Sequence, residues 1–479
     1  MGIFKIAGGT ITANHLILQN GKAENGGALN ILGGGYIANG GAFLNNTATK
    51  YGGAIYVDAS GSFTTNELAC VDTSVDPDAV EFTGNAAQRG GAIWNKGDVE
   101  INGAASFKNN AATTGSGATN GSFGGAIYNA GTGKVAIDSC DATNPVVFQN
   151  NQATGTTIVA PNGVLKGYSG GAIYNAGSGE VNVTNAKFSG NFAGKYGGAI
   201  SNFATLTATN ATFTSNVASA GGAVQSSGDA TFTNTTFTSN KALAVKGGYS
   251  LDGELDFGGN GGAVFASGSG KSVTFNDATA FSDNEAANAG GAIDFINGSL
   301  KLDGSGTIAV TGNKAGTIGG GLVLASNLTV GKSLSFSVAD NSLAAVGASD
   351  AFHKAGVTGD FAKATDVAAI AAVGAEKLQK IFNATDLSAL ETAGNFYTFV
   401  RYSQLTSNIL CYNDLAHYYE EDGQNPPNKI AVSVDGGETL YLWKESMVAI
   451  DLTNGANKRS FEVKYWAASQ TGATPNTAF

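Results

Sequence analysis

Apolar residues alternate with threonine and other small polar residues over short stretches of the first 345 residues. The segments ATFTSN, ending at Asn216, and ATFTNTTFTSN, ending at Asn240, show this alternation most plainly. A period of two places successive side chains on opposite faces and is typical of β-strands. The pattern therefore predicts many short strands separated by turns.

Two short sequence motifs, here called words, recur along this region and alternate with each other. One is Gly-Gly-Ala followed by an aliphatic residue, and the other is Phe-x-x-Asn. The first word begins at Gly26, Gly52, Gly90, Gly124, Gly170, Gly197, Gly221, Gly261 and Gly290, with variants at Gly40 and Gly320. The second word begins at Phe43, Phe63, Phe82, Phe107, Phe148, Phe188, Phe213, Phe237 and Phe281. Internal repetition of this kind is the signature of a solenoid.

The spacing of the two words predicts the length of one coil. Five intervals from Phe-x-x-Asn to the next Gly-Gly-Ala are 8 or 9 residues, and three swell to 17, 22 and 24 with small polar residues. The shortest full repeat, from Gly197 to Gly221, is 24 residues. At about 3.3 Å per residue, this length makes three short strands and three turns. We therefore expect an all-β fold, a parallel β-solenoid over residues 1–345 with its insertions at one corner.

Each word has a physical role in such a coil. The aliphatic residue and the phenylalanine are expected to form inward ladders with a rise of about 4.8 Å per coil. The glycine pair permits a corner with positive φ or a close approach of two backbones. Asparagine tolerates left-handed backbone, and its amide can bond to the asparagine of the next coil. A phosphate-binding loop explains the glycines less well, because such loops precede a helix and usually contain a lysine. The buried phenylalanines should include Phe107, Phe188, Phe213 and Phe237.

The alternation of GGAI and FxxN resembles the repeats of the chlamydial polymorphic outer membrane proteins. The resemblance extends over about residues 26–322 and rests on roughly nine copies of each word. It implies a right-handed parallel β-helix that is displayed on a cell surface, with adhesion or surface structure as its role. It implies no catalytic residues.

Residues 346–479 follow different rules and predict a smaller α+β domain. This region holds 10 of the 70 glycines, and residues 1–345 hold the other 60. An Ala-rich stretch with helical spacing predicts a helix within residues 359–391. Strands are expected at residues 396–403, 430–434, 439–443, 447–452 and 460–466, with a hairpin at Asp435-Gly436-Gly437. We expect this domain to cap the last coil, to serve in attachment or assembly, or to do both.

Composition and charge exclude several classes of partner. The net charge of −11 divides into −6 for residues 1–345 and −5 for residues 346–479, and no basic cluster occurs. Nucleic acid is therefore not an expected partner. No stretch approaches the ~20 apolar residues of a membrane-spanning helix, so direct membrane insertion is not expected. The opening segment MGIFKIAGGT lacks the apolar core of a secretion signal. We nevertheless expect an extracellular or cell-surface location, because the repeats resemble surface proteins.

Residues able to carry catalysis are sparse in the repeats. Arg89 is the single arginine and His15 the single histidine of residues 1–345. Glycan cleavage in a β-helix needs an acid–base set on one face, typically paired carboxylates. We therefore expect no enzyme and no cofactor. Acidic residues gather at Asp72, Asp76, Asp78 and Glu81, and again at Asp138 and Asp141.

Calcium is the one metal that the first acidic group, Asp72 to Glu81, would suit, because calcium prefers oxygen ligands. The spacing fits no established calcium loop, so solvated acidic loops are the preferred interpretation.

Cys70, Cys140 and Cys411 form no CxxC pair or disulfide framework. Cys70 and Cys140 are expected two coils apart, about 9.6 Å, which exceeds the ~7 Å Cα limit of a disulfide. We therefore expect reduced thiols.

Three functions stay open on this sequence. The first is a non-catalytic structural or adhesive surface protein that assembles head-to-tail into filaments or a layer. The second is a glycan-binding or glycan-cleaving spike similar to phage tailspikes, and the third is an autotransporter passenger fragment. For the first function, the partners are other copies of the chain, with a host-cell or glycan surface as a further partner. The strands at an open end of a solenoid have unpaired backbone groups that can pair with another chain. We therefore expect an assembly contact between the first coil and the C-terminal region of a neighbouring copy. Its candidate residues are Ile3, Phe4 and Ile6 on the first coil, and Trp443 and Trp466 on the neighbour.

Overall fold

The computed structural model describes most of residues 2–343 and a set of strands beyond residue 395. The described ranges are 2–66, 79–114, 121–139, 142–155, 168–244, 249–250, 253–254, 258–316, 320–324, 327–330, 335–339, 341–343, 396–397, 409–411, 429–433, 439–443, 446–455 and 458–467. Regular secondary structure within these ranges is β-strand throughout. None of the described residues forms a helix long and apolar enough to cross a membrane. The chain forms two units, Met1–Gly259 with Ala263–Phe265, and Asn260–Gly262 with Ala266–Phe479.

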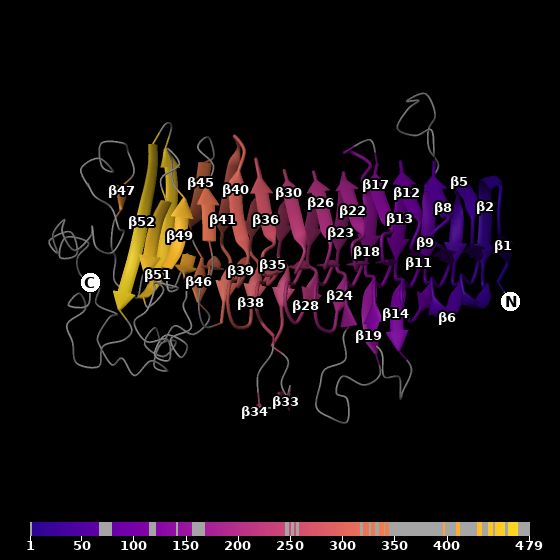
Figure 1. Ribbon diagram of the computed structural model, residues 1–479, viewed down its shortest axis with the longest axis horizontal. Helices are drawn as coiled ribbons and strands as arrows, with labels where there is room; N and C mark the ends of the chain where they lie inside the picture. Colours follow the sequence, from indigo (N-terminus) through magenta and orange to yellow (C-terminus); the bar gives the residue numbers. More distant parts are fainter. Residues whose placement is uncertain are drawn as a thin grey trace. The chain divides into compact units, whose positions relative to one another are not determined.

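Unit 1 is a parallel β-helix, as the repeat spacing predicts. Each coil supplies one strand to sheet A, two strands to a bent sheet B and one strand to sheet C. Figure 1 shows these coils as successive rungs, coloured from indigo to magenta. The shortest coil contains β25 (Ile200–Asn202) in sheet A, β26 (Thr205–Thr209) and β27 (Thr212–Thr214) in sheet B, and β28 (Val217–Ala218) in sheet C. One of the three expected sides is thus bent into two strand segments.

The other strands of unit 1 take equivalent places in their coils. Sheet A also contains β1 (Phe4–Ile6), β4 (Leu29–Ile31), β7 (Ile55–Val57), β11 (Ile93–Asn95), β16 (Ile127–Asn129), β21 (Ile173–Asn175) and β29 (Val224–Ser226). The first arm of sheet B contains β8 (Gly61–Thr65), β12 (Asp98–Asn102), β17 (Lys134–Asp138), β22 (Glu180–Thr184) and β30 (Asp229–Thr233). Its second arm contains β9 (Val80–Thr83), β13 (Ala105–Lys108), β18 (Val146–Gln149), β23 (Ala186–Ser189) and β31 (Thr236–Thr238). The long strands β2 (Thr10–Gln19) and β5 (Gly34–Leu44) run through both arms.

Sheet C closes each coil with a short strand. It contains β3 (Lys22–Asn25), β6 (Thr47–Tyr51), β10 (Ala86–Ala87), β14 (Ala111–Thr114), β19 (Gln152–Gly155), β24 (Phe192–Ala193) and β32 (Lys241–Ala242) as well as β28. The three long sequence insertions all follow a strand of this sheet and precede a Gly-Gly-Ala corner. The short pairs β15 (Ser122–Phe123) with β20 (Tyr168–Ser169), and β33 (Tyr249–Ser250) with β34 (Gly253–Glu254), lie within or beside these insertions. These three insertions therefore share one corner, as expected, whereas the insertion between β8 and β9 falls between the two arms of sheet B.

Both glycines of the Gly-Gly-Ala word are required by the backbone. Gly197 has a φ of +62°, in the left-handed region that favours glycine. A Cβ on Gly198 would lie 2.1 Å from the carbonyl oxygen of Gly222 in the next coil. The corner therefore combines the positive φ and the close backbone approach that the sequence indicates.

The phenylalanines of the second word form a continuous stack inside unit 1. Successive ring centroids lie 4.4 to 4.9 Å apart and successive planes differ by at most 8°. Phe107, Phe188, Phe213 and Phe237 are completely buried, as expected. Beside them runs an equally buried aliphatic ladder. The stack contains Phe43, Phe82, Phe107, Phe148, Phe188, Phe213 and Phe237.

The asparagines of the same word form a second buried ladder. Asn191 donates from Nδ2 to Oδ1 of Asn216 at 2.9 Å, and Asn216 donates to Asn240 at 3.0 Å. Asn216 Nδ2 also donates to the carbonyl oxygen of Phe188 at 3.0 Å. The predicted bond from one coil to the next is thus confirmed. The ladder of unit 1 contains Asn46, Asn85, Asn110, Asn151, Asn191, Asn216 and Asn240.

Two details of the repeat differ from the sequence interpretation. The left-handed residue is usually the one before the ladder asparagine, as at Asn45, Asn109 and Ser215. The word at Phe63 does not belong to the phenylalanine stack, because Phe63 pairs in register with Tyr36 and Val99 on the first arm of sheet B. A copy of the Phe-x-x-Asn word therefore takes its usual place in the coil only when its distance from the neighbouring words fits the repeat.

Unit 2 contains coils of the same design. Its solenoid strands are β36 (Ser272–Asn276), β37 (Ala280–Ser282), β38 (Glu285–Ala286), β39 (Ile293–Phe295), β40 (Ser299–Asp303), β41 (Thr307–Thr311), β42 (Lys314–Ala315), β43 (Leu322–Leu324), β44 (Asn327–Val330), β45 (Ser335–Ala339) and β46 (Ser342–Leu343). They pair in parallel, as in β36–β40–β44 and β37–β41–β45. Asn284, Asn313 and Asn341 continue the ladder pattern at 2.8 and 2.9 Å. The remaining strand of the repeats, β35 (Val264–Ala266), divides between the two units.

The C-terminal strands extend the sheets of unit 2. β48 (Ile409–Cys411) pairs in parallel with β43, and β49 (Lys429–Ser433) pairs in parallel with β44. β49 forms an antiparallel hairpin with β50 (Thr439–Trp443), which confirms the hairpin expected at residues 435–437. β51 (Ser446–Gly455) and β52 (Lys458–Ala467) form a second antiparallel pair, and β47 (Phe396–Tyr397) pairs with β52. The helix expected within residues 359–391 lies outside the described residues.

Candidate binding surfaces

A group of partly buried aromatic side chains lies on the outer side of unit 1, where the chain passes from sheet C to sheet A. One row comes from the residue after each Gly-Gly-Ala-Ile word, where Tyr56, Trp94, Tyr128 and Tyr174 stand in register on β7, β11, β16 and β21. A second row comes from the residue before each word, where bridges join Tyr51 to Arg89 and Arg89 to Phe123. We call the two rows together the aromatic cluster, which contains Tyr51, Tyr56, Arg89, Trp94, Phe123, Tyr128 and Tyr174.

The rings of this cluster pack against one another along the stack of coils. The Tyr56 and Trp94 centroids lie 4.6 Å apart with planes 1° apart, and Tyr128 stacks on Tyr174 at 5.2 Å. Phe123 approaches Tyr174 at 4.7 Å with a tilt of 48°. Since parallel stacking pairs the ring faces with each other, these rings turn mainly their edges outward.

Arg89 lies at the centre of the cluster. Its Cζ atom lies 5.6 Å from the Phe123 centroid, 5.7 Å from Tyr128 and 6.0 Å from Tyr51, within the range of cation–π attraction. Its Nε atom is buried and has no hydrogen-bond partner. Within the described residues, Arg89 forms no ion pair with a carboxylate. The guanidinium is therefore held by aromatic rings and by a hydrogen bond with the Tyr128 phenol, and no acid among the described residues compensates its charge.

Three tyrosines of the cluster, Tyr56, Tyr128 and Tyr174, stay neutral in the physiological range. Burial raises the pKa of Tyr174 to about 12 and raises the pKa of Tyr56 above its usual value of 10. Burial also raises the pKa of Tyr128, although the neighbouring Arg89 opposes that rise. Each phenol therefore keeps its proton and can donate a hydrogen bond.

The same two rows have a different chemistry in the coils that follow. The row after the word continues with Ser201 and Gln225, and Ser201 Oγ donates to Gln225 Oε1 at 2.7 Å. The row before the word continues with Ser169, Tyr196 and Ala220, so one further aromatic residue follows. The coil backbone is the same in both places, so the fold does not require aromatic residues in these rows.

The first coil is a second distinctive surface. Ile3 and Phe4 are 41% exposed, and Ile17 on β2 is 56% exposed. Ile6, the third predicted contact residue, is 3% exposed and pairs in register with Ile31. Ile3 and Phe4 thus lie on the surface of this coil, whereas Ile6 packs inside it.

The predicted acidic group lies largely outside the described residues. Asp72, Asp76 and Asp78 fall there, as do Cys70 and Cys140, so the calcium and thiol expectations stay predictions. Glu81 lies on β9 with an exposed side chain. Among the described residues, no three His, Cys, Asp or Glu side chains gather as a metal site would require.

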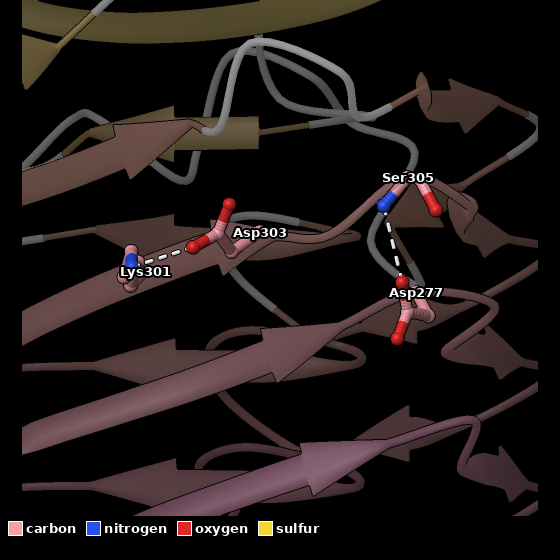
Figure 2. Close-up of polar contacts among 4 residues, drawn as sticks. All are labelled: Asp277, Lys301, Asp303 and Ser305. Atoms are coloured by element: carbon pink, nitrogen blue, oxygen red, sulfur yellow. Dashed lines mark hydrogen bonds and ion pairs between the residues drawn. The ribbon is translucent and has the colours of Figure 1, made fainter.

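Acidic side chains at one edge of unit 2 have structural partners. Figure 2 shows Asp277 Oδ1 accepting a hydrogen bond from the Ser305 backbone nitrogen at 3.0 Å. In the same view Lys301 Nζ lies 2.5 Å from Asp303 Oδ2. Asp277 has a φ of 51°, so its side chain holds a left-handed turn against the next coil. These carboxylates stabilise the coil edge.

The predicted C-terminal contact residues lie on antiparallel strands. Trp443 on β50 stands opposite Lys429, and Trp466 on β52 stands opposite Met447. Both therefore belong to the C-terminal hairpins, as the sequence indicates.

Sequence reasoning missed the aromatic cluster and a second asparagine ladder. Both signals lie in the word GGAIYN, where the tyrosine faces outward and the asparagine faces inward. Asn95 donates to Asn129 at 2.9 Å, Asn129 to Asn175 at 3.0 Å and Asn175 to Asn202 at 2.9 Å. Extending the repeated word by two residues reveals both features.

The comparisons with known proteins identify the repeat. Residues 39–58, 145–176 and 234–267 match the family model of the Chlamydia polymorphic membrane protein repeat. The resemblance noted in the sequence is therefore confirmed at these three places. Neither the curated proteins nor the solved structures contain a match to the chain.

Proposed function

We propose that this chain is a non-catalytic protein of a cell surface, structural and adhesive, that self-associates through its first coil. The observation that carries the self-association is the exposed apolar surface of that coil among the described residues. The buried side chains of the repeats support the structural role, because the phenylalanines stack and the asparagines form hydrogen bonds from one coil to the next.

The first coil presents unpaired strand edges. Among the described residues, β1, β2 and β3 each pair on one side, with β4, β5 and β6 respectively. Such an edge carries unpaired N–H and C=O groups that template pairing with another chain. The apolar side chains on this coil are strongly exposed, at 39–56%: Ile3, Phe4, Ile11, Leu16 and Ile17.

The proposed occupant of this edge is the C-terminal region of a second copy. Residues 2–25 carry two lysines and one glutamate, a net charge of +1, whereas residues 346–479 carry a net charge of −5. These opposite charges favour a head-to-tail contact over a head-to-head contact. The aromatic strands that contain Trp443 and Trp466 supply the apolar half. Contact between unlike surfaces continues into a filament when its rotation does not close.

Sedimentation velocity of the intact chain over a range of concentrations tests this proposal. We expect species larger than a monomer, and filaments by negative-stain microscopy. Ile17→Lys should reduce the association, because it places a charge in the apolar contact. Phe192→Lys is the matched control, since Phe192 is 38% exposed on β24 in the middle of unit 1, and this variant should associate like the parent chain.

Two results would overturn the self-association. One is a monomer at every concentration, and the other is equal association of the parent chain and Ile17→Lys. A discrete dimer without filaments would replace the head-to-tail contact with a head-to-head contact of two first coils.

A further inference from the structure

We propose that the aromatic cluster around Arg89 is a binding surface for glycans that carry a carboxylate. This inference deepens the adhesive part of the proposed function and names the ligand class. It does not depend on self-association, because it concerns sheet A and leaves the first coil aside.

The cluster is a local feature that the coil itself does not need. Tyr56, Tyr128 and Tyr174 of the cluster are half-buried and Trp94 is 9% exposed, whereas the phenylalanines of the inner stack are completely or almost completely buried. The next coils carry Ser201 and Gln225 in the same row on the same backbone. Tyrosine, tryptophan and arginine are the residues most enriched where proteins bind partners. Their concentration in a few coils therefore indicates a ligand.

Three properties of the cluster favour a negatively charged, oxygen-rich ligand. Arg89 lacks a carboxylate partner among the described residues. Aromatic ring edges carry the positive part of the ring quadrupole, and edges are what the stacked rings turn outward. The phenols of Tyr128 and Tyr174 remain protonated and can donate hydrogen bonds. A ligand carboxylate would complete Arg89, and ligand hydroxyls would pair with the phenols.

A peptide fits this surface less well than a glycan. Peptides that bind sheets add a strand to an open edge and gain main-chain hydrogen bonds. The strands beneath the cluster have no open edge, since β7, β11, β16 and β21 each pair on both sides. An acidic peptide would therefore be held by its side chains alone.

A nucleic acid also fits poorly. Its affinity depends on many cationic contacts with phosphates, whereas the cluster contains one arginine and the chain carries a net charge of −11. A single guanidinium surrounded by neutral donors matches one carboxylate among hydroxyls, which is the pattern of an acidic sugar.

The test compares two sugars that differ by one acidic residue. Binding of 3′-sialyllactose and of lactose to the full chain is measured by titration calorimetry. We expect sialyllactose to bind about tenfold or more tightly, the range for one charge-assisted hydrogen bond. Arg89→Gln should abolish this preference, and Arg89→Lys should retain part of it. Lys195→Gln is the matched control, because Lys195 Nζ lies 4.6 Å from the Tyr196 ring in a neighbouring coil, and it should leave both affinities unchanged.

Circular dichroism of each variant shows whether the β-helix is retained. Equal binding of the two sugars, binding of neither sugar, or an Arg89→Gln variant that keeps the preference would overturn the proposal. Tighter binding of poly-glutamate or of oligo-dT would replace the glycan with a peptide or a nucleic acid. A chain that adheres to cells yet fails these sugar assays would lose this site and keep the adhesive function.

Discussion

The inner and outer faces of sheets A and B of unit 1 follow different rules. Inside, the phenylalanine stack and the asparagine ladder recur in coil after coil, with ring centroids 4.4 to 4.9 Å apart. Outside, the row after the Gly-Gly-Ala-Ile word is aromatic from Tyr56 to Tyr174 and continues with Ser201 and Gln225 in the next coils. A residue type repeated in every coil serves the coil, whereas one confined to a few coils serves something that the coil does not require.

The largest expected difference between the two faces is in packing. Phe213→Ala should lower the free energy of unfolding by about 3–5 kcal/mol, because it leaves a cavity in the stack. Phe203→Ala is the control on the outer face, where Phe203 is 37% exposed, and it should cost less than about 1 kcal/mol. Denaturant unfolding measures both values. Equal costs would remove the distinction between the faces.

A buried acid in unit 2 extends the comparison, because it should make the stability of the fold depend on pH. Asp294 stands after the Gly-Gly-Ala-Ile word of its coil, is 4% exposed, and has its pKa raised by burial from 3.8 to about 7. The fold therefore favours the neutral acid, so stability should be highest below about pH 4 and fall as the pH rises toward 7. A rise from 3.8 to about 7 corresponds to at most about 4 kcal/mol.

Asp294→Asn should remove this pH dependence and raise the melting temperature at pH 8. The matched control is Asp283→Asn, which changes an exposed acid of the preceding coil and should leave the pH profile unaltered. A parent chain whose stability is flat between pH 4 and pH 7 would contradict the assignment.

The asparagine ladder should give a smaller effect than the phenylalanine stack. Asn216→Ala removes the acceptor of the Asn191 amide and the donor to the Phe188 carbonyl. Buried polar groups left unpaired cost about 1–3 kcal/mol. Thr214→Ala, an exposed change two residues away, should cost less than about 0.5 kcal/mol. Thermal unfolding of the two variants compares them, and a ladder variant as stable as the parent would show that the ladder is dispensable.

The repeat pattern predicted the inner face well. Spacing of the two words located the corners, the buried phenylalanines and the coil-to-coil asparagine bonds, because each depends on a contact that every coil must make. Most strands and the hairpin of the C-terminal region followed from alternation and from the Asp-Gly-Gly turn, whereas β48 (Ile409–Cys411) was not predicted.

The outer face could not be predicted in the same way. Tyr56, Trp94, Tyr128 and Tyr174 lie 34 to 46 residues apart in the sequence and come into contact only through the register of the coils. Arg89 gains its significance from three rings of neighbouring coils, which no local pattern reveals. Phe63 illustrates the opposite error, a match to the Phe-x-x-Asn word that does not have the expected position. Phe63 lies on the first arm of sheet B and is not part of the phenylalanine stack.

The most direct test replaces two aromatic side chains of the outer row and leaves the inner ladders intact. A double variant, Tyr128→Gln with Tyr174→Ser, gives the cluster the side chains that Gln225 and Ser201 already supply on the same backbone. Titration with 3′-sialyllactose and thermal unfolding are measured on the same preparation. The account predicts a folded β-helix, destabilised by about 1–2 kcal/mol, that has lost its preference for the acidic sugar. Unchanged sugar binding, or unfolding as severe as that of Phe213→Ala, would contradict the division between a structural inner face and a binding outer face.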